Sequence, residues 1–199
     1  MNMHFIHIPK NAGTSFVKLC RENKNITYNY HNVNVFDTKI TDQMIIIRDP
    51  IKRFISAVYY GLEKWSNDPI IKKLINNNIN TPEKWIQIWM NKDHIHHNLL
   101  MSELLNKNHK IGDNILEYKW TYTPQYKWVN NPKYIIIMDN LYEELKYMNI
   151  NIQHHNKTSK NNTELTKNSI DFLKDFYRKD FILYEKYKNI PIEKRIPIY

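Results

Sequence analysis

A lysine, a glycine and two hydroxyl residues near the start of the chain have the types and spacing of an anion-binding turn. Lys10, Gly13, Thr14 and Ser15 follow a short apolar stretch, His4 to Ile8, that we expect to form a strand. We expect a helix to open at Thr14, and the first N–H groups of a helix have no partner within it. Because the helix dipole is positive there, a phosphate or sulfate could bind, although an ordinary strand-turn-helix has the same pattern.

A second basic segment, Arg48 to Ser56, follows another apolar run, Gln43 to Arg48. Such a run of β-branched residues is typical of a strand buried on both faces of a parallel sheet. Ligands of open parallel sheets bind at the carboxyl ends of the strands, where Arg48 would lie. Its guanidinium suits a phosphate, and Ser56 could donate a second hydrogen bond. A lone arginine would more often pair with Asp49 or cap a helix, but two anion sites indicate a ligand with two separated anionic groups.

The rest of the chain supplies the elements that would position these residues. Further strands are expected at 26–30 and 133–139, and helices at 50–62, from 82 to about 90, around 95–105, at 141–148 and at 166–187. Strands and helices therefore alternate, without an internal repeat or a linker. The pattern predicts one α/β domain over residues 1–199, with a central parallel sheet flanked by helices.

Composition narrows the class of partner without choosing one. The chain has 199 residues and a formal net charge of +9, which favours a polyanionic partner. The single cysteine, Cys20, excludes an internal disulfide, and we expect it to fill space in the core. No apolar run approaches the ~20 residues of a membrane span, and no signal peptide is recognisable. A soluble, cytoplasmic or otherwise intracellular protein is expected.

The order of residues in the first turn argues against an ATP-binding loop. A Walker A motif places its lysine after the second glycine, whereas here Lys10 precedes Gly13. The usual magnesium and triphosphate chemistry is therefore not supported. His94, His96 and His97 are spaced on a helix so that they do not converge on one ion, and no metal site is expected.

Both basic segments resemble the nucleotide motifs of the sulfotransferases that use 3′-phosphoadenosine 5′-phosphosulfate (PAPS). The sequence HIPKNAGTSF from His7 to Phe16 is similar to their 5′-phosphosulfate loop, and RDPIKRFIS from Arg48 to Ser56 is similar to their 3′-phosphate motif. The likeness is strongest to the carbohydrate branch that includes heparan sulfate 2-O-sulfotransferase. Supporting matches are YHNVNVFD at 30–37, TPQY at 123–126, HNKT at 155–158 and DFILY at 180–184.

The resemblance implies a P-loop-like sulfotransferase fold and a role for each matched residue. Lys10 would contact the transferring group, Arg48 and Ser56 would hold the 3′-phosphate, and His31 would be the catalytic base. The branch tends to have a His-x-His pair where this chain has His31 alone. Contacts to the nucleotide are expected from Lys10, Asn11, Ala12, Gly13, Thr14, Ser15, Arg48, Ser56, Lys157, Thr158 and Lys160.

These expectations describe an enzyme that moves a sulfuryl group from PAPS to a hydroxyl of a carbohydrate-like acceptor, with an acidic glycan favoured by the basic charge. Two alternatives remain open. One is a nucleotide-binding phosphotransferase, which the order of Lys10 and Gly13 disfavours. The other is a non-enzymatic basic nucleic-acid-binding protein, which would use the positive charge and the many aromatic residues; nucleic acid is the less expected partner. Without the resemblance, His31 would most simply be a surface or core histidine.

Overall fold

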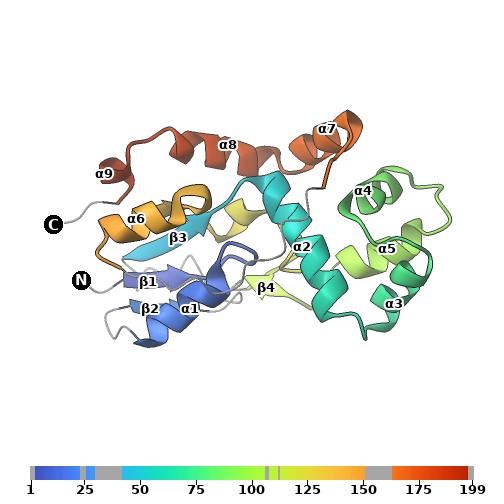
Figure 1. The fold of residues 1–199 in the computed structure, drawn as a ribbon, viewed down its shortest axis with the longest axis horizontal. Helices are drawn as coiled ribbons and strands as arrows, with labels where there is room; N and C mark the ends of the chain where they lie inside the picture. The colour runs from blue at the N-terminus through green and yellow to red at the C-terminus, as the bar shows by residue number, and fades with distance from the viewer. Residues whose placement is uncertain are drawn as a thin grey trace.

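The computed structural model describes residues 3–22, 26–29, 42–105, 108–111, 113–150 and 163–196. Its centre is a parallel sheet of four strands in the order β2-β1-β3-β6 (Figure 1). The strands are β1 (Met3–Ile6), β2 (Ile26–Asn29), β3 (Gln43–Ile47) and β6 (Tyr134–Ile137). All three pairings between neighbours are parallel. The α/β class with a central parallel sheet flanked by helices is therefore confirmed.

Residues of β3 alternate between two hydrophobic clusters, one on each face of the sheet. Met44 and Ile46 lie in the cluster that includes α1 (Gly13–Glu22) and α6 (Leu141–Tyr147). Ile45 and Ile47 lie in the opposite cluster, with Tyr184 of α8 (Arg178–Lys188). Every residue of β3 is buried, as the β-branched run predicts for a strand covered on both faces. Cys20 is buried in the first cluster, as expected, and burial raises the pKa of its thiol to about 12.

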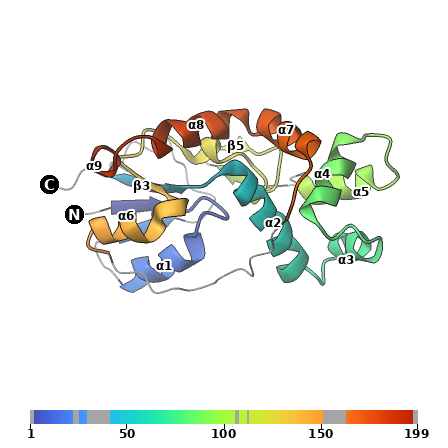
Figure 2. The ribbon, with the colours of Figure 1, turned by 45° about the horizontal axis from the view of Figure 1, so that its top comes forward.

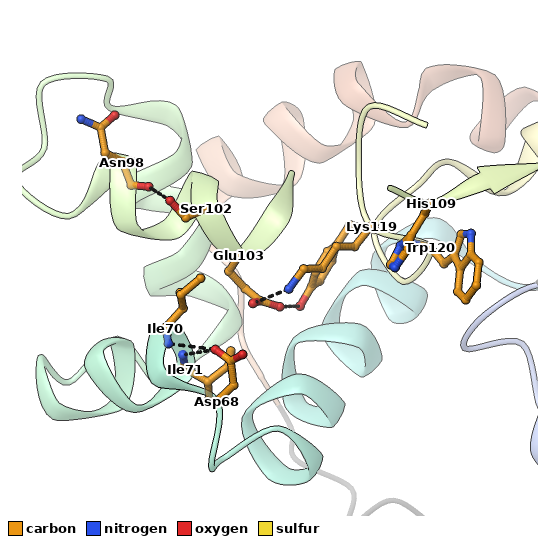
Figure 3. Close-up of polar contacts among 10 residues, drawn as sticks. Asp68, Ile70, Ile71, Asn98, Ser102, Glu103, His109, Lys119 and Trp120 are labelled. Atoms are coloured by element: carbon orange, nitrogen blue, oxygen red, sulfur yellow. Dashed lines mark hydrogen bonds and ion pairs between the residues drawn. The ribbon is translucent and has the colours of Figure 1, made fainter. Parts of the chain in front are cut away.

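A third hydrophobic cluster belongs to helices beyond the end of the sheet. It joins α2 (Pro50–Lys64), α3 (Pro69–Asn76), α4 (Pro82–Met90), α5 (His97–Leu104) and α7 (Lys167–Phe176). Figures 1 and 2 show α3, α4 and α5 gathered at one end of the molecule, with α2 leading to them from the sheet. Figure 3 shows the buried carboxylate of Glu103 in this region facing the ammonium group of Lys119, 2.6 Å away. The helical end thus has its own core and its own half-buried ion pair.

Several expected elements differ from those observed. The helix predicted over 166–187 is wrong as one element, because the chain turns at Tyr177 and continues as α8. The Tyr177 side chain is buried there and donates a hydrogen bond to the carbonyl of Tyr122. Ile95, predicted on the apolar face of a helix, precedes α5 and is 88% exposed. The additional elements are α3, a two-stranded hairpin, β4 (Lys110–Ile111) and β5 (Asn114–Ile115), two 3-10 helices, η1 (Gln125–Trp128) and η2 (Met138–Asn140), and α9 (Ile192–Arg195).

The sheet order creates a switch point between β1 and β3. From β1 the chain passes through α1 to β2 on one side, whereas β3 leads through helices to β6 on the other side. Connections that leave in opposite directions open a crevice at the carboxyl ends of the two strands, and this is where ligands of open α/β sheets bind. The turn after β1 and Arg48, directly after β3, therefore meet at this crevice.

Candidate anion-binding site

The turn between β1 and α1 has an unusual backbone. Lys10 and Ala12 adopt left-handed conformations, with φ of 68° and 56°, which cost roughly 1–2 kcal/mol for a residue with a Cβ. Backbone that switches between left-handed and right-handed conformation turns successive N–H groups toward one point and forms an anion-binding concavity. Ala12 is left-handed and Gly13 begins the helix. The N–H of Asn11 donates to the carbonyl of Ile8 at 3.3 Å, so the turn can add the N–H groups of Lys10 and Ala12 to those of the helix start.

Gly13 is required by the packing of a histidine ring. A Cβ at this position would lie 1.6 Å from Nε2 of His7, so no other residue fits without moving the imidazole. His7 itself is buried, and its ring is stacked on that of Phe5. The glycine thus brings the start of α1 close to the end of β1, which keeps the turn short.

Lys10 extends from this turn toward α2. Its ammonium group lies 3.8 Å from the ring centroid of Tyr60, a cation–π contact. Burial, together with the positive charges of Arg48 and Arg53, lowers the pKa of Lys10 to about 8. These two causes show that the Lys10 ammonium group is partly shielded from water and lies close to other positive charges. A bound anion would relieve the second of them.

Arg48 connects the carboxyl ends of the two strands. Its Nη1 donates a hydrogen bond of 3.0 Å to the carbonyl of Lys10, and its side chain is half-buried. Burial is the main cause that lowers the pKa of this guanidinium. Ser56 is half-buried on α2, the helix that follows Arg48, and its hydroxyl has no hydrogen bond to any residue in the described ranges. Both predicted contacts to the second phosphate therefore belong to the β3–α2 segment.

Arg53 is a third cation of this site, and the sequence analysis did not single it out. It is only 1% exposed; its Nε donates to the carbonyl of Pro9 at 3.0 Å and its Nη2 donates to the carbonyl of Trp120 at 3.4 Å. A signal was present in the sequence, because Arg53 falls among the core-facing positions of an amphipathic helix, where a charge is unusual. Tyr60 was missed as well; it lies seven residues later, on the same side of α2.

No carboxylate within the described ranges forms an ion pair with any of these three cations. The carboxylates whose charges reach them all have other partners, and Asp49, next to Arg48 in the chain, accepts from the N–H of Lys52 at 2.8 Å. Asp139 accepts from Lys52 and from the hydroxyl of Tyr184. Asp180 accepts from two backbone N–H groups, and Glu63 pairs with Lys64 at the surface. The crevice between β1 and β3 therefore has three positive charges with no directly paired negative charge.

The other predicted site residues lie either at the turn between β1 and α1 or outside the described residues. Asn11 is fully buried and points into the protein, where its Nδ2 donates to the carbonyl of Ile46 at 2.7 Å and to Oε1 of Gln125 at 2.9 Å. Ala12 and Ser15 are half-buried near the start of α1, and Thr14 is placed by its backbone alone. The predictions for His31, Lys157, Thr158 and Lys160 fall outside the described residues.

Flanking residues show where two of these segments leave the described structure. β2 ends at Asn29, which is in register with Ile6 at the end of β1, so the chain leads toward position 31 from the same edge of the sheet. The hydroxyl of Thr163 lies 2.6 Å from that of Tyr59 on α2, so the chain after position 162 resumes beside this helix. Asn29 and Thr163, the described residues that flank these segments, thus lie at the carboxyl edge of the sheet and beside α2.

Within the described ranges, no group of three or more His, Cys, Asp or Glu side chains could hold a metal ion, and no helix is long and apolar enough to cross a bilayer. A cavity of about 850 Å³ lies between β5, η1 and the junction of α7 with α8, and none of its lining residues is a predicted site residue.

Comparison of the chain with known protein families, curated proteins and solved structures gives no match.

Proposed function

We propose that this protein is a PAPS-dependent sulfotransferase with a P-loop-like fold that acts on a hydroxyl of a carbohydrate-like acceptor. The observation that carries the proposal is the cluster of Lys10, Arg48 and Arg53, three cations without an ion-paired carboxylate at the switch point of a parallel sheet. All three belong to the segments that resemble the sulfotransferase motifs, Lys10 to the phosphosulfate loop and Arg48 and Arg53 to the 3′-phosphate motif. A nucleotide with two separated phosphates would supply the missing negative charge.

Each part of the crevice then has a task. The N–H groups at the start of α1 bind the 5′-phosphate, because they have no partner within the helix. Arg48 and Ser56 bind the 3′-phosphate. Arg53 is too deeply buried for a direct contact and adds positive charge behind the turn. The resemblance assigns further contacts with the nucleotide to Lys157, Thr158 and Lys160.

Transfer follows the pattern of other in-line displacements. His31 accepts the proton of the acceptor hydroxyl as its oxygen attacks the sulfur, a step worth about 10²–10⁴-fold. The bond from sulfur to the oxygen that bridges to the 5′-phosphate breaks, and that oxygen keeps the electron pair. Lys10 stabilises the charge that develops on it, and adenosine 3′,5′-bisphosphate leaves. Catalysis rests mainly on positioning and electrostatics, as in phosphoryl transfer, and needs no metal in this scheme.

The acceptor follows from charge rather than from a defined pocket. The net charge of +9 favours an acidic glycan over a neutral one, because opposite charge raises the rate of encounter. The hydroxyl must approach the sulfur opposite the bridging oxygen.

Transfer of labelled sulfate from PAPS tests the function directly. The wild-type protein would be incubated with labelled PAPS and a panel of acidic glycans, neutral glycans, small alcohols and tyrosyl peptides. We expect label on a glycan, and a loss of about 10²–10³-fold in Lys10→Ala, the usual effect of removing one group that stabilises developing charge. Lys72→Ala is the matched control, since Lys72 is exposed on α3 and its removal changes the net charge equally.

Two results would replace the proposal. Transfer of phosphate from ATP with none from PAPS would indicate a phosphotransferase. Binding of RNA or DNA that falls steeply with salt, without preference for any nucleotide, would indicate a nucleic-acid-binding protein.

A further inference from the structure

A buried glutamine joins the two halves of the anion site. Gln125, in η1, is fully buried, and its side-chain amide bonds to both backbone groups of Arg48: Oε1 accepts from the N–H at 3.2 Å and Nε2 donates to the carbonyl at 2.8 Å. The same Oε1 accepts from Nδ2 of Asn11 at 2.9 Å. One side chain therefore contacts the end of β3 and the turn after β1.

Gln125 is itself held in place by an aspartate from the last long helix. Asp180 of α8 is fully buried, and its two carboxylate oxygens accept from the N–H groups of Gln125 at 2.7 Å and of Tyr126 at 2.9 Å. Hydrogen bonds to a charged group are stronger than neutral ones, so this contact holds the first turn of η1 firmly. A buried polar chain thus runs from α8 through Gln125 to Arg48 and Asn11.

The position of this chain matters because each half of the site takes a different phosphate. In a nucleotide with 3′- and 5′-phosphates, the distance between the two groups is set by the ribose. Binding the second phosphate is then an intramolecular step, and its gain is lost if the two receptor sites are wrongly spaced. An error of about 1 Å in such placement can cost on the order of a hundredfold.

We infer that Gln125 is the positioning residue that sets the spacing between the two phosphate sites, with Asp180 as its support. The inference rests on the proposed function, because it takes the turn after β1 and Arg48 as the two sites. Gln125 does not contact the ligand. Its role is to give a bisphosphate nucleotide its advantage over a nucleotide with a single phosphate.

The test compares Gln125, which contacts the chain at the carboxyl end of β3, with Gln43, a buried glutamine at the amino end of β3. Gln125→Met removes the bridge at the carboxyl end of β3, and Gln43→Met is the matched control, since Gln43 is 4% exposed at the amino end. Titration calorimetry would measure binding of adenosine 3′,5′-bisphosphate, adenosine 5′-monophosphate and adenosine 3′-monophosphate. For Gln125→Met we expect at least tenfold weaker binding of the bisphosphate, with each monophosphate within about threefold of wild type. Gln43→Met should leave all three affinities within about threefold.

A proportional loss for all three nucleotides in Gln125→Met, or no loss, would overturn the inference. If Gln125→Met does not fold, Asp180→Asn replaces it, since one of the two N–H contacts to η1 is then lost; the same selective effect is expected at smaller size. A wild-type protein that binds none of the nucleotides would contradict the proposed function instead. In that case hydrogen exchange decides the inference: faster exchange at Arg48 and at residues 10–12 in Gln125→Met, but not in Gln43→Met, supports it, and unchanged exchange overturns it.

Discussion

The buried arginines Arg195 and Arg53 differ in their partners: Arg195 pairs with a carboxylate, whereas Arg53 donates to backbone carbonyls. Arg195 of α9 forms a bidentate ion pair with Glu144 of α6, at 2.8 and 2.9 Å, and also donates to the carbonyls of Ile135 and Ile190. Arg53 has carbonyl acceptors alone and no ion pair in the described part of the chain. Burying an unpaired charge is costly, so its persistence needs a reason.

The cations with a carboxylate partner connect structural elements, and those without one lie at the candidate site. Arg195 is buried beside Glu144 and, at the helical end, the half-buried Lys119 pairs with the buried Glu103; both pairs fasten elements together. Lys10, Arg48 and Arg53 meet at the crevice between β1 and β3, where carbonyls and an aromatic ring are their partners. Where a buried cation serves the fold, this protein supplies the negative charge; at the crevice we expect the ligand to supply it.

The largest expected effect comes from breaking the structural pair. Glu144→Gln should lower the free energy of unfolding by about 3–5 kcal/mol, because it leaves Arg195 buried without its anion. Urea denaturation would measure the loss, with Glu143→Gln, an exposed neighbour on α6, as the control. Nucleotide affinity of the folded protein should not change. A loss below about 1 kcal/mol would show that the pair contributes little and would remove the contrast with Arg53.

A change of pH should weaken anion binding through Lys10. With a folded-state pKa of about 8, Lys10 loses its proton as the pH rises from 7 to 9, whereas the nucleotide phosphates are already ionised at pH 7. The dissociation constant of adenosine 3′,5′-bisphosphate should therefore rise about tenfold over this range, which corresponds to about 1.4 kcal/mol.

Lys10→Arg separates this cause from other effects of pH. An arginine stays protonated at pH 9, so the variant should lose most of the dependence. Titration calorimetry at pH 7, 8 and 9 would follow both proteins. An equal decline in wild type and Lys10→Arg would show that a different group titrates.

The smallest effect should follow from removing the unpaired arginine. Arg53→Met removes a charge that is costly to bury but leaves the carbonyls of Pro9 and Trp120 without their donor, so we expect a net loss of only about 1 kcal/mol. Urea denaturation without added anions would measure it beside Glu144→Gln. A loss of 3 kcal/mol or more would mean that the charge of Arg53 is already balanced in the free protein.

The sequence predicted the parts of the fold that depend on local pattern. The all-apolar runs of β3 and β6 identified strands of a parallel sheet, and Asp49 with Pro50 marked the start of α2, where the Asp49 side chain accepts from the N–H of Lys52. The break at Tyr177 was missed because the apolar stripe continues through it. What stops the helix there is tertiary, the burial of Tyr177 against Tyr122.

The candidate site was predictable to a similar extent. Lys10 and Arg48 could be identified because each follows a strand, and the structure shows them in contact. The roles of Gln125 and Asp180 could not be predicted. They depend on contacts between residues that are far apart in the chain, by 114 positions for Asn11 and Gln125 and by 55 for Gln125 and Asp180. No spacing rule in one sequence reports such contacts, although both residues lie in segments, TPQY and DFILY, that resemble sulfotransferase patterns.

The most direct measurement of the central claim is the affinity of the wild-type protein for adenosine 3′,5′-bisphosphate, beside Arg48→Ala and the charge-matched Lys72→Ala. Titration calorimetry at fixed salt should show binding to wild type and to Lys72→Ala, and a loss of at least tenfold in Arg48→Ala, because a charged hydrogen bond contributes about 1.5–3 kcal/mol. Equal affinities in all three proteins, or no binding to wild type, would contradict the claim that the cations between β1 and β3 form the binding site of an anionic nucleotide.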